Sequence, residues 1–114
     1  MDKKIAYKGL NKDLTCLGFQ YEVGKTYKHD GDVVKCAEGG FHSCESPIDI
    51  FNYYDPAYSV FYEVEVSGDI DSDEDDSKIA SAEITLKAEI KLPDLITKAV
   101  DYIVSKCEPN NKKH

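Results

Sequence analysis

Hydrophobic and polar residues alternate along several short stretches of the chain, a pattern typical of half-buried strands. The longest alternations are at residues 60–66 and 84–90, where every second side chain is apolar and most of the others are Glu, Lys or Thr. Shorter stretches of similar composition predict further strands at 5–10, 18–23, 25–28 and 33–36. Most of the chain before residue 90 is therefore expected to be strand and turn.

The two longest alternations are expected to pair with each other. In an antiparallel arrangement, Lys87 and Lys91 would lie near Glu63 and Glu65. Exposed pairs of opposite charge across a sheet contribute roughly a few tenths of a kcal/mol each. This pairing is a hypothesis about strand register.

A short helix is predicted at about 47–54. Ser46 has the chemistry of an N-cap, Pro47 suits the first helical position, and Asp49 stands where it would close a capping box. The side chains expected to be buried by this helix are Ile48, Phe51 and Tyr53 or Tyr54.

A second helix is predicted at about 93–107, beginning at Pro93 and stopped by Glu108-Pro109. Apolar residues recur at helical spacing and would form one stripe. They are Ile96, Ala99, Val100, Ile103, Val104 and Cys107. We expect this stripe to cover the sheet.

These elements predict an α+β fold with a mainly antiparallel sheet of about 5–6 strands, one short helix at about 47–54 and one C-terminal helix at about 93–107. The chain has 114 residues, 41% of them hydrophobic, which is enough for one core. We therefore expect a single α+β domain at 1–109, followed by a flexible tail at 110–114.

The charge balance narrows the classes of partner. The formal net charge is −8 at pH 7, and Arg is absent. Because phosphate contacts need clustered basic residues, direct binding of nucleic acid is not expected. No apolar run approaches the roughly 18 residues of a membrane span, so we predict no membrane contact and a location in the cytoplasm of a host bacterial cell. No cofactor is predicted.

An acidic segment and a group of tyrosines form the candidate partner-binding surface. The carboxylates are Asp69, Asp71, Asp73, Glu74, Asp75 and Asp76, and the tyrosines are Tyr53, Tyr54 and Tyr58. The segment starts like a calcium loop, but Glu74 stands where such a loop needs Gly and Ala80 where it needs Glu. An electrostatic contact with a basic partner protein is the alternative to a plain solvated loop.

The four cysteines, Cys16, Cys36, Cys44 and Cys107, are expected to be free thiols. Cys36, His42 and Cys44 lie within nine residues and offer ligands that zinc accepts. A second possibility is a Cys44 nucleophile activated by His42. Buried structural thiols are the third, and the sequence leaves all three open.

Several segments resemble an uncharacterised small domain found in phage and bacterial proteins. They are Tyr7-Lys8-Gly9, residues 16–27, Gly40-Phe41-His42-Ser43-Cys44, Pro47, residues 51–54 and residues 76–80. The resemblance covers nearly all of the chain from Ile5 to Ile90. It implies membership of that family and brings no activity with it.

The order of some of these segments is also similar to the nicotinamide pocket of the ADP-ribosyltransferase fold. This similarity implies a NAD pocket lined by Tyr7, His42, Tyr53 and Tyr54, with Tyr53 or Tyr54 stacking on the nicotinamide. Lys8 stands where that fold has His or Arg, and His42 where it has Tyr. The resemblance therefore implies a degenerate relative.

Two functional hypotheses follow. The first is a small, non-enzymatic protein of a phage or mobile element that binds a host protein through its acidic, tyrosine-bearing surface. An inhibitor of a nucleic-acid-binding defence system, of the anti-CRISPR kind, is one form of it, because an acidic surface can occupy a site meant for phosphates. The second is a NAD-binding domain like that of the ADP-ribosyltransferases.

Overall fold

The fold combines antiparallel strands with one long helix. The computed structural model describes residues 3–16, 18–29, 40–72 and 77–111. In chain order the elements are β1 (Lys4–Asn11), β2 (Thr15–Cys16), β3 (Phe19–Gln20), β4 (Thr26–Lys28), β5 (Phe41–Cys44), the 3-10 helix η1 (Pro47–Asn52), β6 (Ser59–Ser72), β7 (Lys78–Ile90) and α1 (Leu92–Asn111).

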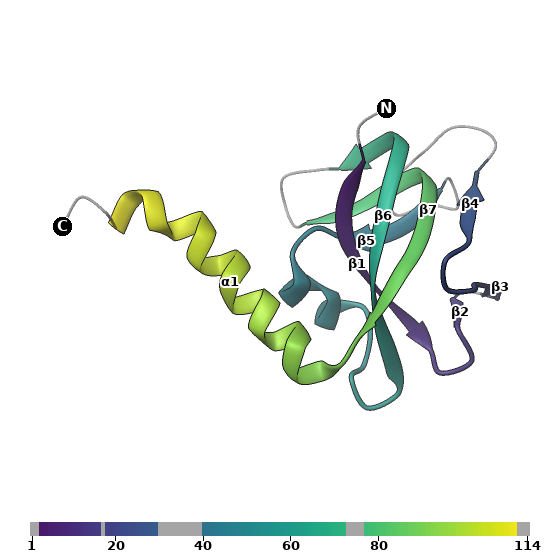
Figure 1. The fold of residues 1–114 in the computed structure, drawn as a ribbon, viewed down its shortest axis with the longest axis horizontal. Coiled ribbons are helices and arrows are strands. Elements are labelled where there is room, and N and C mark those ends of the chain that lie inside the picture. Colours follow the sequence, from purple (N-terminus) through teal and green to yellow (C-terminus); the bar gives the residue numbers. More distant parts are fainter. Residues whose placement is uncertain (1–2, 17, 30–39, 73–76, 112–114) are drawn as a thin grey trace.

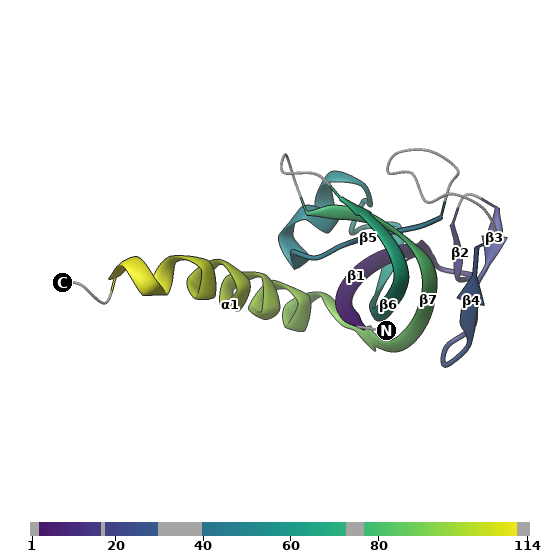
Figure 2. The same cartoon turned by 90° about the horizontal axis from the view of Figure 1, so that it is seen from above.

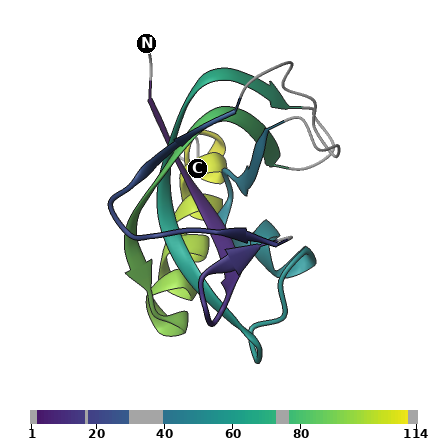
Figure 3. The same cartoon turned by 90° about the vertical axis from the view of Figure 1, so that its right-hand side faces the viewer.

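The main sheet has five strands in the order β4-β7-β5-β1-β6, and β6 also pairs with β7 (Figure 1). Strands β1, β5, β7 and β6 therefore form a ring of pairings that closes on itself around a common interior (Figure 3). Its neighbouring strands are antiparallel, and β2 and β3 form a separate small hairpin. The predicted α+β class with a mainly antiparallel sheet is confirmed.

The hydrophobic core has two parts, one on each side of β1 and β6. The larger lies inside the ring, and its buried members are Ala6, Leu10, Tyr21, Tyr62, Val64, Val66, Ile79, Ile84 and Leu86. The smaller lies under η1 and the start of α1, and its buried members are Ile50, Phe61, Ile90 and Leu95. The alternation along β6 fits this division, because Phe61 points to the face opposite that of Tyr62, Val64 and Val66.

The two longest predicted strands are confirmed and form one long antiparallel hairpin of β6 and β7. Both extend beyond the predicted ends, so Asp69 and Asp71 lie within β6 rather than in a loop. Gly68 has φ of +78°, at a bulge between Ser67 and Ile70.

None of the expected charge pairs across this hairpin is formed among the described residues. A second bulge follows Glu63 and shifts the register. Glu63 pairs instead with Lys98, Glu65 with Lys3, and Lys91 with Glu89.

The short helix is present, but its predicted cap is wrong. Ser46 makes no side-chain cap. The Asp49 carboxylate instead accepts hydrogen bonds from the backbone N–H and hydroxyl of Ser77, at 3.1 and 2.8 Å. The inward residue is Ile50, whereas Ile48, expected to be buried, is exposed. Asp49 thus ties η1 to the start of β7, a partner that local sequence could not reveal.

The long helix does not cover the sheet as predicted. Figures 1 and 2 show α1 extending away from the strands along the long axis of the molecule. Leu95 and Ala99 are buried against the body. The rest of the stripe, Ile96, Val100, Ile103 and Val104, is 45–52% exposed, and Cys107 is exposed too. The helix also continues past Pro109 to Asn111.

The short strands β2, β3 and β5 differ from expectation. The strand predicted at 18–23 is reduced to β3, and Val23 makes only an isolated bridge to Leu86. Strand β5 was not predicted, because the glycine pair before it and its mixed composition hide the pattern. The strand predicted at 33–36 lies outside the described residues.

Within the described part of the chain, no helix is both long enough and apolar enough to cross a membrane.

Candidate ligand-binding cavity

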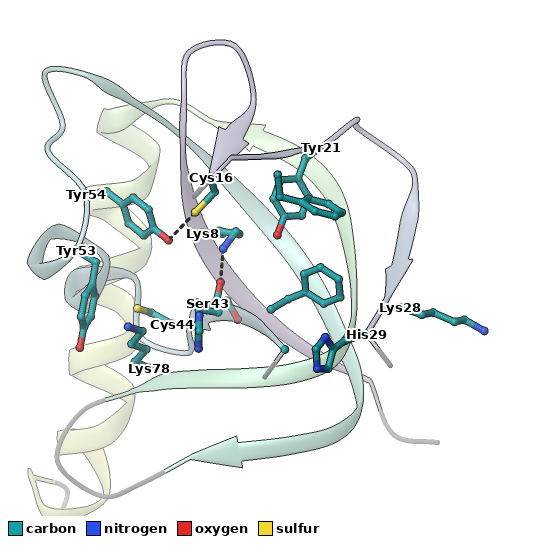
Figure 4. Close-up of a pocket in the computed structure, with 14 residues that line it drawn as sticks. Lys8, Cys16, Tyr21, Lys28, His29, Ser43, Cys44, Tyr53, Tyr54 and Lys78 are labelled. Carbon is teal, nitrogen blue, oxygen red and sulfur yellow. Dashed lines mark hydrogen bonds between the residues drawn. The ribbon is translucent and has the colours of Figure 1, made fainter. Parts of the chain in front are cut away.

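A cavity of about 510 Å³ lies between β1, β5, the β2–β3 hairpin and the segment after η1 (Figure 4). We call it the Lys8 cavity. Its lining residues are Lys8, Cys16, Phe19, Tyr21, Lys28, His29, Gly40, Phe41, His42, Ser43, Cys44, Tyr53, Tyr54 and Lys78. Aromatic rings, thiols and basic groups thus surround one space, and the described lining contains no carboxylate.

Lys8 lies at the inner end of this cavity and is only 2% exposed. It shares the inward face of β1 with Ala6 and Leu10, because side chains two residues apart point the same way. Its Nζ donates a hydrogen bond to the carbonyl oxygen of His42, at 2.5 Å. No described carboxylate forms an ion pair with it, which is rare for a buried lysine.

Burial lowers the pKa of Lys8, because removal from water disfavours the charged ammonium. The thiols of Cys16 and Cys44 act in the opposite direction, Cys16 also through a hydrogen bond, and the charge of Lys78 adds to the lowering. Burial prevails among these effects. Lys8 therefore carries a larger fraction of neutral, nucleophilic amine than an exposed lysine.

Tyr54 connects the cavity to the smaller part of the core. Its ring packs against that core, as do Tyr7 and Phe51. Its hydroxyl lies 3.8 Å from Cys16 Sγ. The ring rests on Gly9, where a Cβ atom would overlap it. Burial raises the pKa of Tyr54, so its hydroxyl stays protonated.

The other wall of the cavity is aromatic. Phe19 packs edge to face with Tyr21, Tyr27 and Phe41, with ring centroids 4.8, 5.2 and 5.7 Å apart. Tyr21 also faces Lys8, whose Nζ lies 5.6 Å from the ring centroid. Such a wall offers flat apolar contact to a ligand, together with the hydroxyl of Tyr21.

The mouth of the cavity is basic. The amine of Lys78 lies 4.4 Å from the centroid of the Tyr53 ring. His29 stands beside Phe41, with ring centroids 6.4 Å apart, and Lys28 points outward from the same end in Figure 4. The Ser43 hydroxyl oxygen is buried and has no hydrogen-bond partner among the described residues. A polar group of a ligand would satisfy it.

Three of the four residues expected to line a NAD pocket lie around this cavity. His42, Tyr53 and Tyr54 line the Lys8 cavity, but Tyr7 does not. Its position next to Lys8 on β1 turns its side chain to the opposite face of the strand. There it lines a second cavity of about 450 Å³ beside α1, which we call the helix-side cavity.

Two of the three candidate zinc ligands, His42 and Cys44, line the Lys8 cavity, while Cys36 lies outside the described residues. The described chain contains no group of three or more His, Cys, Asp or Glu residues that could hold a metal ion. Cys16 and Cys107 are free thiols. Cys44, the candidate nucleophile, is buried.

The candidate partner-binding residues are spread over the molecule. Tyr58 is 73% exposed and stands just before β6, whereas Asp69 and Asp71 lie near the other end of that strand. The carboxylates at 73–76 lie outside the described residues. Binding of a host protein through these groups stays a prediction, and so do the phage origin and the cytoplasmic location.

Sequence reasoning left Lys8, at the inner end of the cavity, out of the candidate site, although a signal for it was present. Lys8 stands between Ala6 and Leu10 in the period-two pattern of the first strand. An ionisable residue on an apolar face is a marker of a functional site. Cys16 and the rings of Phe19, Tyr21 and Phe41 gave no such signal, because their meeting depends on tertiary contacts.

Comparison with known proteins identifies the family and no activity. Residues 4–98 match a family described as a domain of unknown function (DUF7666). The chain belongs to the DUF7666 family. The match spans every described residue that lines the Lys8 cavity and ends within α1. No curated protein and no solved structure matches the chain. The expected membership of an uncharacterised family is thus confirmed, while the similarity to ADP-ribosyltransferases stays a prediction.

Proposed function

We propose that this DUF7666 domain binds a small organic anion that carries a flat ring. The observation that carries the proposal is the lining of the Lys8 cavity, in which basic and aromatic groups surround about 510 Å³ without a described carboxylate. Small-molecule sites are typically concave, mostly apolar spaces of roughly 300–1,000 Å³ with a few convergent polar groups. The cavity meets each of these criteria.

The charge distribution favours an anion. The chain carries 22 acidic residues against 14 basic ones, so its average surface repels anions. The cavity reverses this balance locally, with Lys78 and His29 near its mouth and Lys8 inside. A negative group placed beside Lys78 gains more from this charge than it would in open water, because the surrounding medium is less polarisable.

The shape of the lining favours a ring. Phe19, Tyr21 and Phe41 form a continuous aromatic wall, and Tyr53 stands across the opening under the Lys78 amine. The buried hydroxyl of Ser43 adds a polar contact. Mononucleotides and phosphorylated cofactors have this combination of a ring and a charge. The NAD-binding hypothesis is one specific form of this proposal, in which the nicotinamide half enters the cavity.

Calorimetric titration tests the proposal. The ligands are AMP, nicotinamide mononucleotide, pyridoxine 5′-phosphate and NAD, each compared with its uncharged counterpart where one exists, such as adenosine for AMP. We expect at least one phosphorylated compound to bind, and its counterpart to bind more weakly. Lys78→Glu should weaken binding about tenfold or more, a loss of about 1.4 kcal/mol.

Lys12→Glu is the matched control for charge. Lys12 is an exposed lysine in the turn after β1, away from the cavity. This variant should bind as the wild type does. Failure of every compound to bind at millimolar concentration would overturn the proposal, and so would an equal loss in the Lys12→Glu and Lys78→Glu variants.

A further inference from the structure

We propose that the Lys8 amine is the covalent attachment point for a ligand that carries an aldehyde or ketone group in addition to its ring and its negative charge. This inference rests on the proposed function, because it takes the Lys8 cavity as the ligand site. It adds the chemical class of the ligand and the atom to which it bonds.

The position of Lys8 is the first step of the argument. Its side chain enters the cavity from β1, and Lys78 and Tyr53 line the same cavity to one side of it (Figure 4). A ligand whose anionic group contacts Lys78 would direct its other end toward the Lys8 amine. The same cavity thus offers both an anion contact and an amine.

The protonation state of Lys8 is the second step. The chain has 14 lysines, and Lys8 is the buried one among those described. Burial lowers its pKa, so the free amine with its lone pair is more available than on exposed lysines. Lysines that are desolvated in an apolar pocket, or placed near a second cation, are those that form Schiff bases with carbonyl compounds.

The neighbours of Lys8 supply a path for protons. Cys16 lies close enough to Lys8 to influence its pKa, and its sulfur lies 3.8 Å from the hydroxyl of Tyr54. The raised pKa of Tyr54 keeps its hydroxyl protonated. A thiol and a phenol therefore link the amine to the wall of the cavity, and each can both donate and accept a proton.

The bond-forming step balances without a further reactant. The neutral amine nitrogen attacks the carbonyl carbon and forms a carbinolamine, in which one amine proton passes to the former carbonyl oxygen. Loss of the second amine proton and of that oxygen as water leaves a C=N bond. No oxidant or reductant is consumed, and hydrolysis reverses the step.

A purely structural role for Lys8 is the competing explanation. Strands β1 and β5 meet through a single residue pair, Tyr7 and Cys44, and the hydrogen bond from Lys8 to His42 strengthens that junction. This role needs a donor at position 8 and makes no use of a reactive amine. The two explanations therefore differ in what a carbonyl compound does to the wild-type protein.

The test uses pyridoxal 5′-phosphate, which has a ring, a phosphate and an aldehyde. Wild-type protein is mixed with less than one equivalent of the probe, reduced with borohydride and digested for peptide mass spectrometry. We expect the label mainly on Lys8, as a mass increase equal to that of the probe less one oxygen atom. Pyridoxine 5′-phosphate, which has an alcohol in place of the aldehyde, should suppress labelling of Lys8 and leave that of Lys12 unchanged.

The outcomes separate this inference from the proposed function. Labelling of Lys8 no faster than that of Lys12, while pyridoxine 5′-phosphate still binds by calorimetry, would overturn covalent attachment and leave the anion site standing. If neither compound binds and Lys8 is unlabelled, both proposals fail for this class of ligand. A Lys8→Met variant should lose the label, whereas Lys12→Met should keep the label on Lys8.

Discussion

Two cavities of similar volume lie on opposite faces of β1, and they differ in how their charges are arranged. The Lys8 cavity holds a buried lysine without a described carboxylate partner. The helix-side cavity is lined by lysines together with carboxylates, including Lys98, Asp101 and Glu45. In the helix-side cavity, positive and negative side chains of the protein offset one another. In the Lys8 cavity, the described lining is basic and aromatic without a carboxylate, which is why we place the ligand there.

Tyr54 and Gly9 mark the point where the two sides meet. The ring of Tyr54 belongs to the helix-side core, while its hydroxyl reaches Cys16 in the Lys8 cavity. This crossing is possible because Gly9 has no side chain in the path of the ring. The separation of the two cavities therefore depends on the close contact between the Tyr54 ring and Gly9.

Gly9→Ala should have the largest effect. The added methyl group would overlap the Tyr54 ring, so the ring must leave its place, and we expect the free energy of unfolding to fall by about 3 kcal/mol. Gly18→Ala is the control, because Gly18 has φ of +81° but open space around it. It should cost only about 1 kcal/mol. Urea unfolding of both variants measures this, and equal losses would refute the close contact.

Lys8 should make stability rise with pH. Its pKa is lower in the folded chain than the ordinary lysine value of 10.5. Between these two pH values the unfolded chain binds more protons than the folded chain, so the free energy of unfolding rises with pH. The free energy of unfolding should increase there by up to about 1.4 kcal/mol per pH unit. The measurement is best made below pH 10, since Tyr21 and Tyr54, whose pKa values are raised, reverse the trend above it.

Comparison with Lys8→Met isolates this contribution. The variant should lose the part of the slope that belongs to Lys8, whereas Lys12→Met should keep it. Denaturant unfolding at several pH values gives both slopes. An identical slope in the wild type and Lys8→Met would mean that Lys8 is protonated in the folded protein as readily as in water.

Lys98→Met should have the smallest effect, because it breaks a charge pair that water already screens. Lys98 Nζ lies 4.0 Å from Glu63 Oε1, and both side chains are partly exposed. Such pairs contribute roughly 0–1 kcal/mol. Thermal unfolding should therefore change little. A loss as large as that of Gly9→Ala would show that the helix-side cavity also depends on a critical contact.

The sequence predicted those parts of the fold that depend on the regular spacing of apolar residues. Strands β6 and β7 alternate clearly enough to be located and paired, and the apolar spacing located α1. Period alone does not tell what an apolar stripe touches, so the packing of Ile96, Val100 and Ile103 on the sheet was predicted wrongly. Bulges after Glu63 and Ser67 likewise changed the register without a local signal strong enough to place them.

The candidate site was predictable only in part. His42, Tyr53 and Tyr54 were grouped by their order in the chain and line one cavity, whereas Tyr7, grouped with them, lines the other. Lys8 was overlooked, although alternation with Ala6 and Leu10 directs it inward. The aromatic wall joins Phe19 and Tyr21 of one segment to Phe41 of another, and only tertiary contacts bring these rings together.

The most direct test of the account is a map of amide chemical shifts in the wild-type protein as pyridoxine 5′-phosphate is added. We predict that the shifts concentrate on Lys8, on residues 41–44 and on Tyr53 and Tyr54, around the Lys8 cavity. Shifts concentrated instead on Lys98, Asp101 and Tyr102 would place the ligand in the helix-side cavity and contradict the account.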